Sequence, residues 1–223
     1  MTLSTIRSRQ ADLVDRRIFT NSISIIGCGA IGSFTALTLA KMGFYKMTVW
    51  DDDTVGEENI SNQFYPYTSI GRAKVEALKE MLFKFETIDI DHHYCRWSKD
   101  IPITTDYVIM AVDSMAVRKE IFDSISRSVT VQGFIDGRMG GQQAEVYAVN
   151  LSHRDNVKAY KNYLWSDSEA SELPCTQKAV MYNVLWIASS IANALRLMAE
   201  GKPYQSIMNM DFQNQVQNNI VAV

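Results

Sequence analysis

The chain has 223 residues, of which 47% are hydrophobic and 21% are charged, a composition typical of a globular domain. We therefore expect residues 1–223 to form a single domain. The formal net charge of −3 gives no support for nucleic acid or an anionic membrane as the main partner. No apolar run reaches the roughly 18 residues of a membrane span, and the N-terminal segment is charged rather than signal-like. A cytoplasmic protein without a membrane anchor is expected.

The hydrophobic spacing predicts strands and helices that alternate along the chain. An N-terminal helical arm is expected within residues 1–20. The expected strands then cover residues 22–26, 46–51, 90–95, 107–112, 129–135 and 144–149. The expected helices between and after them cover residues 30–42, 71–85, 115–127 and 176–200. Residues 52–70 and 151–177 are expected as long loops, the second of crossover type, and the tail from residue 205 as one or two closing strands.

This alternation indicates an α/β fold. We expect a Rossmann-like, doubly wound, mostly parallel sheet flanked by helices, with antiparallel closing strands at the C-terminal end. Ligands of such sheets bind at the carboxyl ends of the strands.

A glycine turn marks the carboxyl end of the first strand. Gly27, Gly29 and Gly32 form the pattern G-x-G-x-x-G between this strand and the first long helix. Gly27 permits a tight turn, Gly29 lets backbone N–H groups approach a phosphate, and Gly32 lets helix and strand pack closely. The turn, including Ala30 and Ile31, is therefore interpreted as a phosphate site at a helix N-terminus. The alternative is a glycine turn used only for packing.

An acidic residue supports nucleotide binding. Asp51 follows Gly32 by 19 residues, close to the roughly 20 expected of a carboxylate that holds ribose hydroxyls. These features alone are also compatible with an NAD-dependent oxidoreductase.

Three downstream segments favour a different nucleotide. They read D-D-D-T-V at 51–55, N-I-S-N-Q at 59–63 and G-R-A-K at 71–74. Together with the glycine turn they resemble the ThiF/MoeB/ubiquitin-activating-enzyme (E1-like) adenylyltransferase family, whose pattern continues D-x-D-x-V, N-x-x-R-Q and G-x-x-K. The resemblance covers most of the chain and is strongest over residues 22–82. It implies ATP and Mg²⁺ as cofactors, with no zinc site, because the C-x-x-C pairs of that site are absent.

The resemblance also implies roles for individual residues. Asp51 would hold the ribose of ATP, and Asn59 and Lys74 would contact the phosphates. Lys74 would stabilise charge that develops on the α-phosphate and the leaving pyrophosphate. Asp113 would bind Mg²⁺, although a helix N-terminal carboxylate is the alternative. The implied nucleotide site comprises Gly27, Gly29, Ala30, Ile31, Gly32, Asp51, Asp53, Asn59, Asn62, Gln63, Lys74, Asp113 and Ser114.

Two positions bear on the positively charged residues that the family uses at its phosphate site. Asn62 stands where the family has the arginine of N-x-x-R-Q, so one positive charge near the phosphates is absent. The family also supplies an arginine across a dimer interface from an N-terminal R-Q pair, which Arg9-Gln10 matches. Arg9 would then act in the partner's site of a homodimer, or else lie on a solvated helix face.

The three cysteines are Cys28, Cys95 and Cys175. They form no C-x-x-C pair, which argues against a disulfide framework and fits a reducing compartment. The resemblance implies that Cys175 could receive an activated acyl group as a thioester, or carry sulfur. The alternative is an unreactive thiol, and Cys28 and Cys95 are expected to be structural.

The segment Asp136-Gly137-Arg138 is expected at a turn that ends a strand, where Arg138 could bind a carboxylate or serve an ordinary turn.

The expected function is an ATP-dependent adenylyltransferase that activates a C-terminal carboxylate as an acyl adenylate. The acyl group could then be transferred to Cys175. The implied partner is a small ubiquitin-like or sulfur-carrier protein, or a peptide, with a C-terminal glycine. The residues Lys74, Asp113, Arg9 and Cys175 are the expected catalytic set. A non-catalytic nucleotide-binding scaffold is the alternative, motivated by Asn62.

Overall fold

The computed structural model describes residues 8–164 and 180–221 of the chain. Eight strands form one sheet in the order β3-β2-β1-β4-β5-β6-β7-β8. The first five strands in this order, β3 to β5, pair in parallel, and the last three strands are added antiparallel. This topology confirms the expected α/β sheet. The strands are β1 (Ile23–Ile26), β2 (Met47–Trp50), β3 (Asp91–His93), β4 (Tyr107–Met110), β5 (Gly133–Gly140), β6 (Gln143–Asn150), β7 (Gln205–Asp211) and β8 (Val216–Val221).

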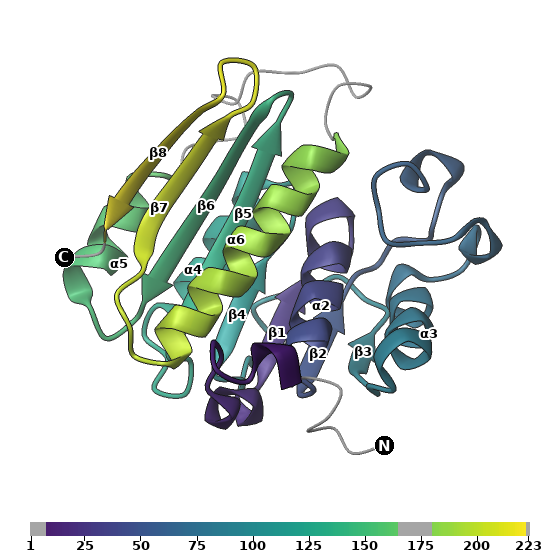
Figure 1. Ribbon diagram of the computed structural model, residues 1–223, viewed down its shortest axis with the longest axis horizontal. Helices are drawn as coiled ribbons and strands as arrows, with labels where there is room; N and C mark the ends of the chain where they lie inside the picture. The colour runs from purple at the N-terminus through teal and green to yellow at the C-terminus, as the bar shows by residue number, and fades with distance from the viewer. Residues whose placement is uncertain (1–7, 165–179, 222–223) are drawn as a thin grey trace.

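The helices form layers on both faces of this sheet (Figure 1). They are α2 (Ala30–Met42), α3 (Lys74–Glu86), α4 (Met115–Ile125), α5 (Arg154–Lys161) and α6 (Met181–Ala199), with 3-10 turns η1 (Ser8–Gln10), η2 (Arg16–Thr20), η3 (Glu57–Asn59) and η4 (Tyr67–Ser69). One apolar core joins α2, α3 and α6 to the sheet, and a second core joins α4 and α5 to the opposite face. Among the described residues, none of the helices combines the length and apolar character needed to cross a membrane.

α2 has the bounds that the sequence predicts. Gly43 ends it with a φ of 121°, a conformation that side chains rarely adopt, and its N–H donates to Leu39 and Ala40 carbonyls in the last turn. α3 begins three residues later than expected, because Ala73 pairs with Thr54 in an isolated bridge before the helix. That bridge fixes both ends of the loop between β2 and α3.

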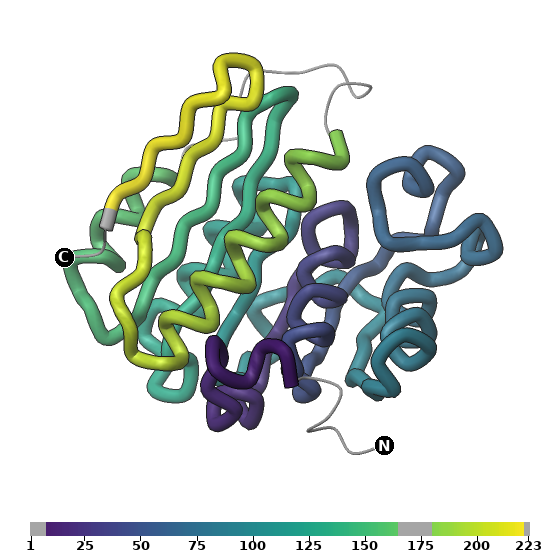
Figure 2. The backbone as a smooth tube through the Cα atoms, viewed as in Figure 1, coloured from purple at the N-terminus to yellow at the C-terminus, as the bar shows by residue number. Residues whose placement is uncertain are grey.

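The N-terminal arm is not the regular helix that its polar sequence suggested. Within its described part it forms two 3-10 turns, η1 and η2. The arm packs at the lower end of α2 and α6, where it is drawn in dark purple (Figure 2). Arg196 donates to the carbonyl of Leu13 at 3.2 Å, and the buried carboxylate of Glu200 accepts the N–H of Asp15 at 2.9 Å.

Two predictions about the second half of the chain were wrong. The segment 151–177 was expected to be irregular, but α5 lies within it; its residues 165–177 lie outside the described residues. Asp136, Gly137 and Arg138 were expected at a turn, but they continue β5 as a buried strand. A side chain at position 137 would meet Ile187 and Ile191 at 2.9 Å, so Gly137 lets α6 approach the sheet closely and the strand continues past it.

Candidate nucleotide site

The glycine turn lies at the carboxyl edge of the sheet, between β1 and α2. A Cβ on Gly27, whose φ is 95°, would lie 2.5 Å from the carbonyl oxygen of Ala111, and a Cβ on Gly32 would lie 1.9 Å from the carbonyl of Gly27. These two glycines are therefore required for packing. Gly29 differs, because the only heavy atom near its Cβ position is Nε2 of Gln63, at 3.9 Å. The open side of the turn thus faces the Gln63 amide. Ala30 and Ile31, which follow Gly29 in α2, are buried.

Asp51 connects this turn to the end of β2. Its carboxylate accepts the N–H of Cys28 at 2.5 Å and the N–H of Asp53 at 2.9 Å. Burial raises the pKa of Asp51, while these two hydrogen bonds and the charge of Lys74 oppose the rise. The carboxylate is thereby held at the edge of the turn.

Lys74 is brought to the same place by the first turn of α3. Its side chain is only 7% exposed, and Nζ lies 2.7 Å from Oδ2 of Asp53. Its own N–H donates to the carbonyl of Asp53 at 3.0 Å. The Thr54 to Ala73 bridge explains this juxtaposition, because it returns the chain to β2 immediately before Lys74. A buried ammonium therefore lies beside the carboxylates that follow β2.

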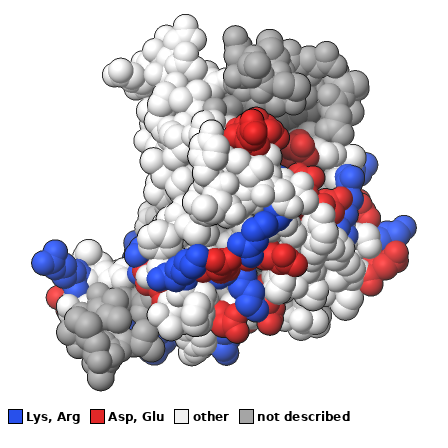
Figure 3. Space-filling view, turned by 90° about the vertical axis from the view of Figure 1, so that its right-hand side faces the viewer, with Lys and Arg blue, Asp and Glu red and all other residues white. Residues whose placement is uncertain are grey.

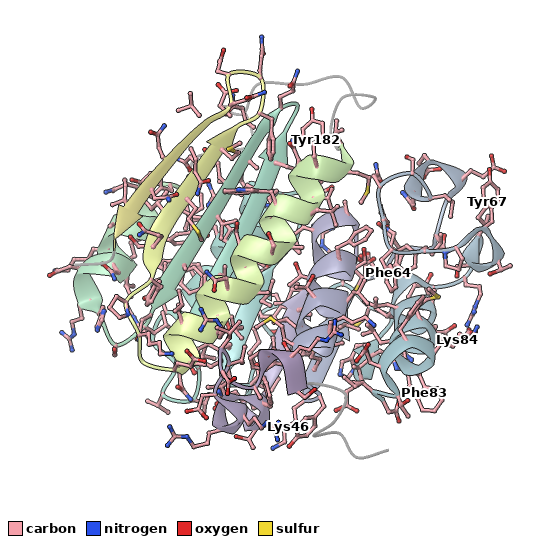
Figure 4. All side chains as sticks on the ribbon, in the orientation of Figure 1. Lys46, Phe64, Tyr67, Phe83, Lys84 and Tyr182 are labelled. Carbon is pink, nitrogen blue, oxygen red and sulfur yellow. The ribbon has the colours of Figure 1, made fainter. Side chains whose placement is uncertain are left out.

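The loop between β2 and α3 is docked onto the glycine turn by two bonds that the sequence analysis missed. The hydroxyl of Tyr65, a buried residue, donates to the carbonyl of Cys28 at 2.6 Å. The N–H of Phe64 donates to Oγ of Ser33 in α2 at 3.0 Å. Phe64 also lies between Phe34 and Phe85, whose ring centroids are each 5.6 Å from its own (Figure 4). Neither tyrosine nor serine stands in a periodic pattern, so only the structure identifies them.

The side-chain amides of this loop differ in their hydrogen bonding. The side-chain oxygen of Asn59 accepts the N–H of Gly56 at 2.9 Å and so stabilises η3. In contrast, Oδ1 of Asn62 and Oε1 of Gln63 are buried and accept no hydrogen bond from the described part of the chain. Buried polar groups in native proteins nearly always have partners. The Gln63 side chain lies beside Gly29, so a polar ligand at this turn would account for an unpaired oxygen there.

Asp113 and Ser114 follow β4 at the same edge. Ser114 begins α4 by accepting the N–H of Val117 at 3.4 Å, and Asp113 is exposed just before it. Because β4 pairs with β1 and Ala111 abuts Gly27, the loop that carries Asp113 lies next to the glycine turn. A second acidic group, Asp51 to Asp53, has carboxylate oxygens within 4.8 Å of one another.

Arg9 lies near the C-terminal end of α2, whereas the glycine turn lies at its N-terminal end. The side chain of the adjacent Gln10 donates to the carbonyls of Lys41 and Met42, at 3.1 and 3.3 Å. These carbonyls end α2, whereas the glycine turn begins it. A helix of 13 residues is about 20 Å long at 1.5 Å per residue. Arg9 is therefore remote from the glycine turn of its own chain.

The cysteines do not add a described nucleophile to the site. Cys28 is buried inside the turn, and burial raises the pKa of its thiol well above its ordinary value. Cys95 is exposed after β3, and Cys175 lies outside the described residues. Arg138, considered above as a carboxylate ligand, is buried and bonded to Asp136.

Comparison with known proteins gives a family match. The sequence profile of the ThiF family matches residues 5–219. Ubiquitin-like modifier-activating enzyme 5 of Drosophila simulans is 27% identical over 166 residues, which cover 70% of this chain and 35% of that protein. Adenylyltransferase and sulfurtransferase MOCS3 of Aedes aegypti is 29% identical over 110 residues, covering 47% of this chain and 25% of that protein. The chain thus spans about a third or less of the length of these relatives.

Two solved structures show the same fold. Escherichia coli MccB, crystallised with AMPCPP and selenomethionine MccA, has a TM-score of 0.79 at 14% identity, with 99% of this chain and 72% of that chain covered. The E. coli tRNA N6-threonylcarbamoyladenosine dehydratase TcdA has a TM-score of 0.68 at 18% identity, with 89% and 95% covered. At such identities the likeness establishes the fold.

Proposed function

The chain belongs to the ThiF family, and we propose that it is an ATP-dependent adenylyltransferase. The observation that carries this proposal is the meeting of three features near the carboxyl end of β1: the open side of the glycine turn at Gly29, the buried Lys74 ammonium, and the buried side-chain oxygens of Asn62 and Gln63, which have no hydrogen-bond partner among the described residues. An NAD-dependent oxidoreductase would need the turn and Asp51 but has no use for the lysine.

The residues present fit ATP. Gly29 leaves room for a phosphate at the N-terminus of α2, where backbone N–H groups and the helix dipole favour an anion. The carboxylate of Asp51 lies at the end of β2, where it would accept ribose hydroxyls. Lys74 places a positive charge beside this position, and Asn62 and Gln63 supply side-chain oxygens that have no hydrogen-bond partner among the described residues.

The residues also fit a magnesium ion. Asp113 is an exposed carboxylate at the same edge, and carboxylate oxygen is the ligand type that Mg²⁺ prefers. We propose Asp113 as the metal ligand, with Ser114 beside it. The bound ion would supply charge neutralisation for the triphosphate.

The proposed reaction joins a carboxylate to the nucleotide. A carboxylate oxygen of the substrate attacks the α-phosphorus of ATP, pyrophosphate leaves, and an acyl adenylate is formed. A carboxylate is already ionised at neutral pH, so no general base is required. Lys74 stabilises the charge on the α-phosphate and the leaving pyrophosphate, and the glycine turn holds the triphosphate in place.

The substrate that we propose is the C-terminal glycine of a small ubiquitin-like or sulfur-carrier protein, or of a peptide. The names of the relatives support this class, because they include a ubiquitin-like modifier-activating enzyme and a sulfurtransferase. MccB, which shares the fold, was crystallised with AMPCPP and MccA. Transfer of the acyl group to Cys175, and a cytoplasmic homodimer that places Arg9 in the partner's site, are further parts of the proposal.

Pyrophosphate exchange into ATP tests the proposal. The full chain is incubated with ATP, Mg²⁺, labelled pyrophosphate and a panel of peptides that end in Gly-Gly, with the matching C-terminal amides as controls. Exchange that depends on the free carboxylate supports the adenylyltransferase. ATP binding without exchange for any carboxylate would contradict the adenylyltransferase and favour a non-catalytic nucleotide-binding scaffold. The absence of the family's arginine at Asn62 suggests that alternative.

A further inference from the structure

A buried ionic cluster lies between α4, β5 and α5, apart from the nucleotide contacts described above. Its centre is Asp136, whose side chain is completely buried. Oδ1 of Asp136 accepts from Nε of Arg118 at 2.8 Å, and Oδ2 accepts from Nε of Arg138 at 2.6 Å. The hydroxyl of Tyr160 donates to the same Oδ2 at 2.8 Å. Both arginines are themselves buried, so the carboxylate is satisfied on both oxygens within the protein.

The two arginines connect this cluster to α4, β5, β6 and the residues after α5. Nη2 of Arg118, in α4, also donates to the carbonyl of Gly137 in β5 at 3.2 Å. Nη1 of Arg138, in β5, donates to the carbonyl of Tyr163 after α5 at 2.7 Å. The guanidinium of Arg138 lies 4.4 Å from the ring centroid of Tyr147 in β6. One carboxylate therefore holds two cations that tie neighbouring elements together.

The cluster lies directly under the loop that carries Asp113. Asp136 pairs with Met110, the last residue of β4, and Asp113 follows three residues later. Arg118 lies in the first turn of α4, where its N–H donates to the carbonyl of Ser114 at 3.1 Å. The position of Asp113 is thus fixed on one side by β4 and on the other by a helix start that Arg118 attaches to β5.

We propose that Asp136 and Arg118 are positioning residues that hold the Asp113 loop in place for Mg²⁺ and the nucleotide phosphates. They touch neither ligand; they act through the start of α4. This inference rests on the proposed function, because it assigns the cluster to the metal side of that site. Outer-shell partners of this kind orient the groups that contact a metal, and their loss commonly lowers metal affinity about tenfold or more.

The test compares two substitutions of a buried carboxylate by its amide. Asp136→Asn removes the charge that holds both arginines. Glu200→Gln is the matched control, because Glu200 is also buried and accepts from Arg196, Lys202 and the N–H of Asp15, but at the far end of α6. Both variants of the full chain are compared with wild type in three measurements: thermal unfolding, calorimetric AMPCPP binding over a Mg²⁺ series, and amide hydrogen exchange.

We expect Asp136→Asn to raise the Mg²⁺ concentration for half-maximal AMPCPP binding about tenfold, with metal-free AMPCPP binding unchanged. In the ligand-free protein, the amides of Val117 and Arg118 should exchange faster than in Glu200→Gln at an equal distance below each melting temperature. Equal Mg²⁺ dependence and equal exchange in the two variants would overturn the proposal and leave the cluster a matter of stability alone.

Two further results are decisive in other ways. If Asp136→Asn does not fold, Arg118→Lys takes its place, because lysine keeps the charge but lacks the planar fork whose Nε and Nη2 bond Asp136 and the Gly137 carbonyl separately. The same shifts are expected, and their absence overturns the proposal. If wild type binds no AMPCPP at any Mg²⁺ concentration, the proposed function fails, and the exchange rates of Val117 and Arg118 decide whether the cluster holds the helix start.

Discussion

Individual glycines of the turn have different roles, one in packing and one in leaving space for a ligand. Gly32 has no room for a side chain, because a Cβ would lie 1.9 Å from the carbonyl oxygen of Gly27, whereas Gly29 has room. Gly29 also has a negative φ of −74°, outside the left-handed region that favours glycine. The pattern G-x-G-x-x-G therefore combines glycines required for folding with one that leaves space for a ligand.

Alanine at these two positions should have opposite effects. Gly32→Ala should destabilise the protein by about 3 kcal/mol or more through overpacking. Gly29→Ala should leave the melting temperature unchanged or slightly raised, while its methyl group weakens AMPCPP binding. Melting curves and calorimetry measure both effects. A stable Gly32→Ala protein, or a Gly29→Ala protein with full nucleotide affinity, would show that the turn works differently.

Tyr65 is a residue that no sequence pattern identified. Tyr65→Phe removes only the hydroxyl that donates to the Cys28 carbonyl, so the free energy of unfolding should fall by about 1 kcal/mol. Tyr67→Phe is the control, because Tyr67 lies in the same loop but is 74% exposed (Figure 4). Urea denaturation compares the two. Equal stability of both variants would mean that the hydroxyl does not secure the loop.

At the scale of elements, α3 presents a mixed charged surface to solvent. Figure 3 faces this side of the molecule and shows Lys and Arg side chains interleaved with Asp and Glu. Glu80 bonds Lys84 one turn later and Arg72 before the helix. These two hydrogen bonds, that of Lys84 first, lower the pKa of Glu80 from its ordinary 4.5 to about 2.

The lowered pKa gives a pH dependence of definite sign. A carboxyl whose pKa is lower in the folded state stabilises the fold above its unfolded pKa, and this contribution is lost as the pH falls through the folded value. The difference in urea midpoint between wild type and Glu80→Gln should therefore be largest above about pH 4.5 and vanish near pH 2. A difference that does not change over this range would contradict the bonding of Glu80.

The elements also show what the sequence could and could not predict. Periodicity and glycines predicted α2 to the residue, because local packing and a positive φ at Gly43 decide its bounds. α5 was missed, because it is short and polar and only Tyr160 of its residues is buried. β5 was expected to end before Asp136, because a D-G-R segment resembles a turn. Asp136 is neutralised by Arg138 of that same segment and by Arg118, which lies 18 residues away in α4.

The candidate site divides in the same way. The glycine turn and Asp51 could be named from their spacing along the sequence, and Lys74 from the resemblance to the family. The docking of the loop by Tyr65 and Ser33 could not, because those contacts span 37 and 31 residues. The sequence likewise could not show that Gln10, next to Arg9, bonds the C-terminal end of α2, away from the glycine turn.

At the scale of the whole molecule, Arg9 is remote from the glycine turn of its own chain, and we propose that it acts in the site of a second copy. In a homodimer, a chain with Lys74→Ala can still lend Arg9, and a chain with Arg9→Ala can still use Lys74. Mixing the two inactive variants in equal amounts should therefore restore about a quarter of wild-type exchange activity, since half the dimers are mixed and each has one complete site. A mixture as inactive as its components would contradict action of Arg9 across the dimer.

The proposed ATP site lies between the glycine turn and Lys74, with Mg²⁺ at Asp113. Isothermal titration of the wild-type chain and of Lys74→Ala with AMPCPP and Mg²⁺ tests it most directly, with NAD as a competitor. We expect one site per wild-type chain, no displacement by NAD, and at least about tenfold weaker binding by Lys74→Ala, which loses a charge-assisted contact. Absence of binding, unchanged affinity in Lys74→Ala, or displacement by NAD would contradict the account.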